Sequence, residues 1–191
     1  FYLFLFVLIV PNVVLCFTEP LPLVAKIANV LLPLGCYYLI MTLSRNCGKM
    51  LWILFLFVFF GAFQIVLLYL FGQSIIAVDM FLNLATTNSS EAMELLDNLL
   101  PALITIVILY IPALILGMIS IVRKRTLSVR FIRRERRRAW VVLGAGLVSL
   151  GAAFLLDKKY EMTSDLYPVN VCYNVVPVSY THLTLPTKLE V

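Results

Sequence analysis

Long apolar stretches constrain the fold of this chain more than any other feature. A helix needs about 20 mostly apolar residues to cross the ~30 Å hydrocarbon core of a bilayer. Five segments have this character: Phe1–Phe17, Leu23–Leu43, Met50–Phe71, Leu99–Val122 and Ala139–Leu156. Hydrophobic residues make up 62% of the chain, whereas they make up roughly half of a soluble domain. The sequence therefore predicts an all-α, polytopic membrane domain with five transmembrane helices.

The first of these segments has an unusual beginning. Phe1–Phe17 carries no initiator methionine and is only just long enough to cross a bilayer. It also lacks the basic n-region and the small-residue cleavage site of a signal peptide. We therefore expect the sequence to begin inside a longer transmembrane helix.

Basic residues are concentrated in two connections. Arg45 and Lys49 follow the second predicted span, and a denser group fills the link between the fourth and the fifth: Arg123, Lys124, Arg125, Arg130, Arg133, Arg134, Arg136, Arg137 and Arg138. Short loops rich in Lys and Arg stay cytoplasmic. Because both connections are even-numbered, one orientation satisfies them, with the amino end in the cytoplasm and the carboxyl end outside. Beside two spans, such a run is a topology signal that also meets anionic lipid headgroups, and we expect no nucleic-acid partner.

Motifs for metal or cofactor chemistry are weak in this chain. The single histidine, His182, stands near the carboxyl end, and the four cysteines show no metal-ligand spacing: Cys16, Cys36, Cys47 and Cys172. Gly144 and Gly146 faintly resemble a GxGxxG motif, but a dinucleotide site needs a strand-turn-helix unit. Small residues repeat every four positions nearby and favour close helix packing instead: Ala145, Ser149 and Ala153. The sequence predicts no metal ligand and no catalytic residue.

A transporter is a weaker interpretation of the same helices. Transporters carry ionisable residues at membrane depth, often in broken helices of an internal repeat. Gln64 is the one clearly polar residue that we place deep in a predicted span, and no repeat is evident.

A polar connection joins the third and fourth predicted spans on the outer side. Ser74–Asn88 mixes apolar and polar residues, which predicts an interfacial helix on the periplasmic surface. Asn88 as N-cap and Glu91 three residues later fit a capping box, which stabilises a helix by about 1 kcal/mol without any ligand. A second interpretation is that Asn83, Thr87 and Glu91, spaced by four residues, point together at a lipid headgroup. The two interpretations are compatible.

The segment "DMFLNLATTNSSEA", Asp79 to Ala92, resembles the DMxxNxxxTNxxEA segment of the lipid A phosphoethanolamine transferases, a family that includes the mobile colistin-resistance enzymes. The resemblance implies a five-helix membrane domain, a bridging segment and an extracytoplasmic, zinc-dependent domain of the alkaline phosphatase and sulfatase type. In that domain a threonine takes phosphoethanolamine from phosphatidylethanolamine and passes it to lipid A. Asn83, Thr87 and Glu91 match the motif and would line the site of the donor headgroup.

The resemblance also implies a location and a domain division. Residues 1–160 would form the membrane domain in the inner membrane of a Gram-negative bacterium, and residues 161–176 would begin the periplasmic bridging segment. "VSYTHLTLPT" resembles the conceptual translation of a transposon adaptor used in DNA library preparation, so we interpret residues 177–191 as a non-native tail. The catalytic domain with its zinc would then be missing and this fragment inactive. In the complete enzyme, masking of lipid A phosphates would give polymyxin resistance.

Two alternatives stay open from the residues alone. The chain could be a non-catalytic membrane anchor for an unrelated periplasmic domain, or, as a weaker alternative, a piece of a transporter. Within the transferase superfamily, a headgroup other than phosphoethanolamine is also compatible with these residues.

Overall fold

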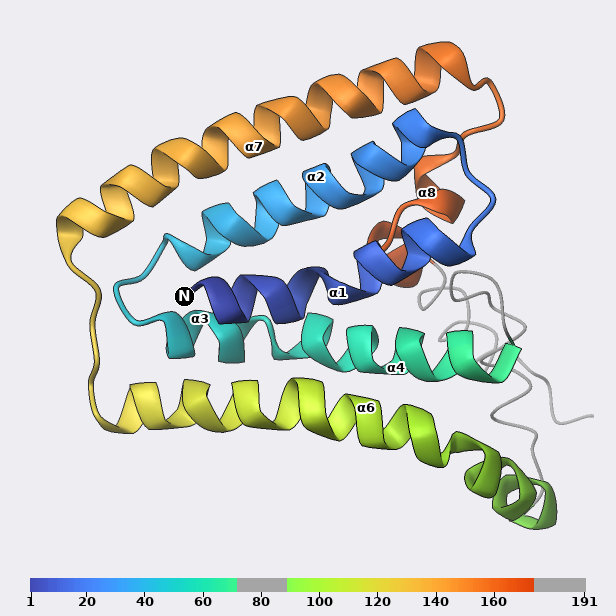
Figure 1. The fold of residues 1–191 in the computed structure, drawn as a ribbon. Coiled ribbons are helices and arrows are strands. Elements are labelled where there is room, and N and C mark those ends of the chain that lie inside the picture. Colours follow the sequence, from blue (N-terminus) through green and yellow to red (C-terminus); the bar gives the residue numbers. More distant parts are fainter. Residues whose placement is uncertain (72–88, 174–191) are drawn as a thin grey trace, which may run out of the picture.

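The computed structural model describes residues 1–71 and 89–173 (Figure 1). In these two ranges the regular elements are helices and there is no strand, which confirms the predicted all-α class. The predicted interfacial helix Ser74–Asn88 and the tail 177–191 lie outside the described residues.

The helices follow the predicted order, with differences in their bounds. The elements are α1 (Tyr2–Thr18), α2 (Leu23–Met41), α3 (Cys47–Ile53), α4 (Phe55–Phe71), α6 (Ser89–Val122), α7 (Val129–Leu156) and the short α8 (Met162–Asp165). The segment predicted as one span from Met50 is interrupted at Leu54, which divides α3 from α4. Helix α7 begins ten residues before the predicted Ala139, so it includes most of the basic link.

Local capping explains where two of these helices begin. The Asn46 Oδ1 atom accepts a hydrogen bond from the Lys49 backbone N–H at 3.1 Å and caps α3. The Ser128 hydroxyl oxygen accepts one from the Phe131 backbone N–H at 3.2 Å and caps α7. Such caps satisfy N–H groups that the first turn of a helix leaves without a partner. The capped start at Ser128 lets α7 continue through the basic run into the apolar stretch.

Three helices in the described part are long and apolar enough to cross a membrane. These are α2, the Leu100–Val122 part of α6, and α7. Helices α3 and α4 meet at a bend of 63° and make a fourth crossing if the pair counts as one broken span. Helix α1 is apolar but has 17 residues. The protein is thus a helical membrane protein with three to four candidate spans.

The long helices lie side by side in a layer, in the order α7, α2, α1, α4 and α6 (Figure 1). Glycines allow a close approach between α2 and α7: a Cβ on Gly146 would lie 2.7 Å from the Cα of Leu32, and one on Gly35 would lie 2.6 Å from the Cα of Leu143. The prediction that Ala145, Ser149 and Ala153 form one packing face of α7 is wrong in part. Ala153 is buried against α2, but Ala145 is exposed.

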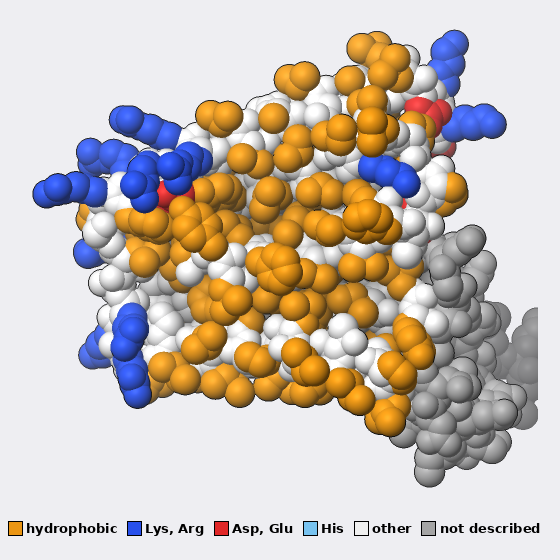
Figure 2. Space-filling model, in the orientation of Figure 1, with side chains coloured by type: hydrophobic (Ala, Val, Ile, Leu, Met, Phe, Trp, Pro, Cys, Tyr) orange, Lys and Arg blue, Asp and Glu red, His pale blue; other side chains and the backbone are white. Residues whose placement is uncertain are grey.

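The surface divides into an apolar middle and a basic end (Figure 2). Hydrophobic side chains cover the middle of the bundle, and most Lys and Arg side chains gather where α2 and α6 end and α7 begins. We call this region the basic end; it contains Arg45, Lys49, Arg123, Lys124, Arg125, Arg130, Arg133, Arg134, Arg136, Arg137 and Arg138. At the opposite end α1 and α4 end, α2 and α6 begin, and α8 packs (Figure 1).

Candidate functional site

Of the three predicted headgroup residues, the structure describes Glu91, which lies at the end of the bundle opposite to the arginines. Asn83 and Thr87 lie outside the described residues. Glu91 belongs to the first turn of α6, which begins at Ser89. This start agrees with the prediction that a helix begins directly after Asn88, and a carboxylate in a first turn interacts favourably with the positive end of the helix dipole.

A network of buried polar side chains occupies the same end. Asn12 of α1 is 1% exposed and Asn29 of α2 is 6% exposed. The Asn12 Nδ2 group donates to the Asn29 carbonyl oxygen at 2.9 Å, and the Tyr160 hydroxyl donates to Asn29 Oδ1 at 2.7 Å. Side-chain amides within an apolar span need such partners, because lipid offers none.

The network also holds the segment that follows α7. Asn29 Nδ2 donates to the Asp165 carbonyl oxygen at 2.6 Å, and Asn12 Nδ2 donates to the Tyr167 carbonyl oxygen at 2.7 Å. Residues 166–171 then pack into the bundle: Tyr167 and Val171 join Leu15 of α1 and Leu67 of α4 in a hydrophobic cluster. The chain beyond the last long helix is therefore fixed to α1, α2 and α4.

Two buried tyrosine hydroxyls lie near Gly61 in the interior of the bundle. A Cβ on Gly61 of α4 would lie 3.0 Å from the Tyr110 hydroxyl and 3.4 Å from the Tyr167 hydroxyl. Both hydroxyls, and the side-chain amide of Asn170, are buried and have no hydrogen-bond partner within the described part of the chain. Burial raises the pKa of Tyr167, so this hydroxyl keeps its proton at neutral pH.

A buried carboxylate stands at the basic end. Glu135 of α7 is fully buried. It accepts a hydrogen bond from the Tyr38 hydroxyl of α2 at 2.5 Å and forms ion pairs with Arg134 at 3.0 Å and Arg138 at 3.2 Å. This contact fastens the basic part of α7 to α2.

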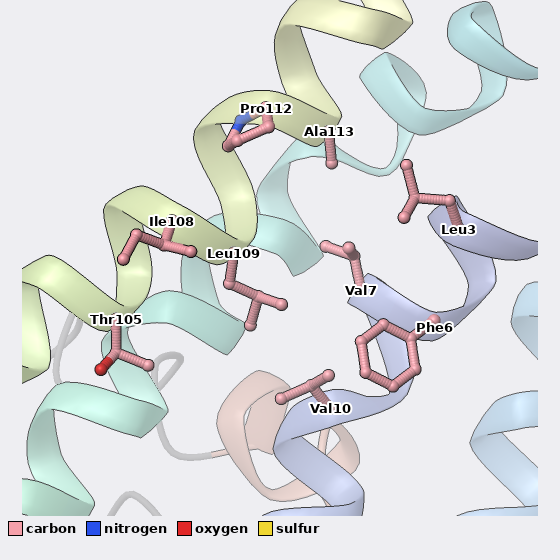
Figure 3. A pocket seen from close by; sticks show the side chains of 9 residues that line it. All are labelled: Leu3, Phe6, Val7, Val10, Thr105, Ile108, Leu109, Pro112 and Ala113. Atoms are coloured by element: carbon pink, nitrogen blue, oxygen red, sulfur yellow. The ribbon is translucent and has the colours of Figure 1, made fainter.

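An open apolar groove of about 530 Å³ lies between α1 and α6 (Figure 3). Val7 and Phe6 of α1 line one wall, and Ile108 and Leu109 of α6 line the other. Thr105 also lines the groove, but its hydroxyl donates to the Pro101 carbonyl at 2.9 Å. The groove therefore offers an apolar surface that suits a lipid acyl chain.

Sequence reasoning missed most of this arrangement. It identified Gln64 as the one polar residue deep in a span, and Gln64 is indeed fully buried. It overlooked Asn12 and Asn29, although an amide inside an apolar stretch was a visible signal. Among the described residues there is also no cluster of three or more His, Cys, Asp or Glu side chains that could hold a metal ion.

No protein-family model, curated protein sequence or solved structure matches this chain. The segment Asp79–Ala92 and the geometry of the bundle are therefore the features that bear on function.

Proposed function

We propose that this chain is the membrane domain of an enzyme that transfers phosphoethanolamine from phosphatidylethanolamine to lipid A. The observation that carries the proposal is the segment Asp79–Ala92, which resembles the DMxxNxxxTNxxEA segment of the lipid A phosphoethanolamine transferases. Its last part lies in the first turn of α6, at the end of the bundle opposite to the arginines.

The proposed topology has five crossings of the bacterial inner membrane. Helix α1 has 17 residues, or about 25 Å at 1.5 Å per residue, and it packs against α2 and α4. With α3 and α4 as one bent crossing, successive helices alternate in direction (Figure 1). The positive-inside rule then assigns the basic end and the amino terminus to the cytoplasm, and the first turn of α6 to the periplasm.

In this orientation the first turn of α6, which carries Glu91, would lie at the depth of lipid headgroups in the outer leaflet of the inner membrane. The carboxylate of Glu91 would pair with the ethanolamine ammonium, while the side chains of Asn83 and Thr87 would bind phosphate or glycerol oxygens. A first-turn carboxylate also stabilises the empty helix end, so Glu91 can serve both roles.

The transfer chemistry itself would belong to a zinc-dependent periplasmic domain that follows residues 161–176. Support for a fixed attachment comes from Asn12 and Asn29, which bind the backbone of Tyr167 and Asp165. A domain attached through this segment would be held next to the donor lipid and the lipid A acceptor, instead of moving on a loose tether.

A chimera tests the proposal. Residues 1–176 are joined to the periplasmic domain of an active lipid A phosphoethanolamine transferase, and the modified fraction of lipid A is measured by mass spectrometry. We expect modification by the chimera and a loss of roughly tenfold or more in the Glu91→Ala variant, because a hydrogen bond to a charged group contributes about 1.5–3 kcal/mol. Glu94→Ala, on the same helix but outside the motif, is the matched control and should stay within about twofold.

Two results would contradict the proposal. If the chimera inserts and folds but leaves lipid A unmodified, the transferase assignment is wrong. If Glu91→Ala modifies lipid A as well as Glu94→Ala does, the headgroup role of Glu91 is wrong, while the transferase assignment of the domain stands.

A non-catalytic anchor is the second candidate, and the docked segment after α7 is equally compatible with it. An anchor needs a firm exit from the membrane, which the bonds of Asn12 and Asn29 supply. For an anchor, substitution of Asn83, Thr87 and Glu91 by Ala would leave the activity of an attached periplasmic domain unchanged.

A further inference from the structure

We propose that a hollow at the basic end binds the phosphate of an anionic phospholipid. The hollow has a volume of about 260 Å³ and lies between the turn after α2 and the first turns of α7. Three arginines line it together with apolar side chains: Arg45, Arg133 and Arg136, beside Leu43, Val129 and Ile132. A site for one water needs only about 15 Å³, so a phosphate group fits within this volume.

The arginines of the basic end differ in their partners. Arg134 and Arg138 pair with Glu135, which is the sole acidic residue of the basic end. In the described ranges no carboxylate forms an ion pair with any of the three arginines that line the hollow. Their positive charge therefore lacks a local counterion, and an anion in the hollow would supply one.

Backbone contacts hold two of the guanidinium groups in position. Arg136 Nη2 donates to the Thr42 carbonyl oxygen at 2.6 Å, and Arg45 Nε donates to the Leu127 carbonyl oxygen at 3.2 Å. A guanidinium has five N–H donors, so each of these bonds leaves others that can bind phosphate oxygens, including in pairs. Because the groups are already oriented, binding costs less side-chain entropy.

The surroundings of the hollow favour a lipid over a soluble anion. Leu43 is 70% exposed and Val129 is 52% exposed, so apolar side chains stand at the rim beside the charges. Trp140, one turn beyond Arg136 on the same helix, is also exposed, and Trp is enriched at the level of the headgroups. A phospholipid uses both features, with its phosphate on the arginines and its ester region on the apolar rim.

Lipid binding to the full chain in detergent tests the proposal. The protein is titrated with phosphatidylglycerol, and bound lipid is counted by native mass spectrometry. The triple variant Arg45→Gln, Arg133→Gln, Arg136→Gln is compared with a control that loses the same charge outside the hollow: Arg123→Gln, Arg130→Gln, Arg137→Gln. We expect apparent affinity to fall roughly tenfold or more in the first variant and less than about threefold in the control.

A single substitution separates weaker lipid binding from unfolding of the protein. Within the described residues, the side chains of Arg45 and Arg136 bind the backbone and that of Arg133 does not. Arg133→Gln should therefore preserve helix content and still weaken binding by roughly threefold. Three results would each overturn the proposal: equal weakening in both triple variants, equal binding of zwitterionic phosphatidylcholine, or displacement of bound phosphatidylglycerol by inorganic phosphate at the same concentration.

Discussion

Asn29 is the residue that joins the most parts of the chain at the end opposite to the arginines. Its side chain accepts from Tyr160 and donates to the Asp165 carbonyl, and its own carbonyl accepts from Asn12. Burial, with a smaller contribution from the Asp165 carboxylate, raises the pKa of Tyr160 to about 12. The Tyr160 hydroxyl therefore keeps its proton and donates throughout the physiological pH range.

Removal of these hydrogen bonds should destabilise the bundle in a graded way. Tyr160→Phe should lower the free energy of unfolding by about 1 kcal/mol, and Asn29→Ala by about 2–3 kcal/mol, because the latter breaks two bonds and leaves a buried hydroxyl without an acceptor. Thermal unfolding in detergent, followed by circular dichroism, measures both, with the exposed Tyr173→Phe as the control.

The raised pKa of Tyr160 also predicts the pH dependence of this loss. A pKa that is higher in the folded state gives a contribution that is complete below the unfolded value, near pH 10, and is lost as the pH rises through about 12. The difference between wild type and Tyr160→Phe should therefore be constant from about pH 6 to 9 and shrink above about pH 10. A Tyr160→Phe protein as stable as wild type at neutral pH would contradict the role of the bond.

The sequence alone could not reveal this network, because its partners are far apart along the chain. Asn12 binds Tyr167 across 155 residues and Asn29 binds Tyr160 across 131 residues. Period and composition identify the helices that carry Asn12 and Asn29, but not which helix ends meet. The burial of Glu135 was hidden for the same reason: within "RRERRR" the pattern predicts a surface residue, and its partner Tyr38 lies 97 residues away along the chain.

At the scale of the element, two glycines of α7 provide a matched pair. A Cβ on Gly146 would meet the backbone of Leu32 at 2.7 Å, whereas a Cβ on Gly144 would meet nothing within 4 Å. Gly146→Ala should therefore force α7 away from α2 and cost about 1–3 kcal/mol. Gly144→Ala should be neutral or stabilise by up to about 1 kcal/mol through helix propensity. Unfolding midpoints of the two variants in the same detergent measure the contrast, and equal midpoints would mean that the helices do not meet at Gly146.

The helices themselves were largely predictable, and the exceptions have local causes. The length of the apolar stretches predicted the bounds of α2 and of the membrane part of α6 within a few residues, because the length and period of hydrophobic residues directly indicate membrane helices. The interruption at Leu54 was not predictable, since no proline or glycine stands there. The break separates two helices that pack differently: a Cβ on Gly48 would lie 2.1 Å from the Gly117 carbonyl oxygen, so α3 packs tightly on α6, whereas α4 packs against both α6 and α1.

At the scale of the whole molecule, the two ends of the bundle differ in charge and in polar contacts. The basic end carries a single, buried acid, Glu135, and most of the arginines. The opposite end carries the asparagine and tyrosine network and the first turn of α6. This asymmetry is what the positive-inside rule uses, and it makes the proposed orientation testable without any assumption about catalysis.

Cysteine labelling tests the orientation. In a background where the four native cysteines are replaced by serine, Arg125→Cys reports on the basic end and Lys159→Cys on the loop after α7; both positions are exposed. A membrane-impermeant maleimide added to intact spheroplasts should label Lys159→Cys and should label Arg125→Cys only after the membrane is permeabilised. We expect this labelling pattern because short loops rich in arginine stay in the cytoplasm. The reverse pattern would put the first turn of α6 in the cytoplasm, away from the outer leaflet, and Glu91 could then not meet a donor headgroup on the periplasmic side.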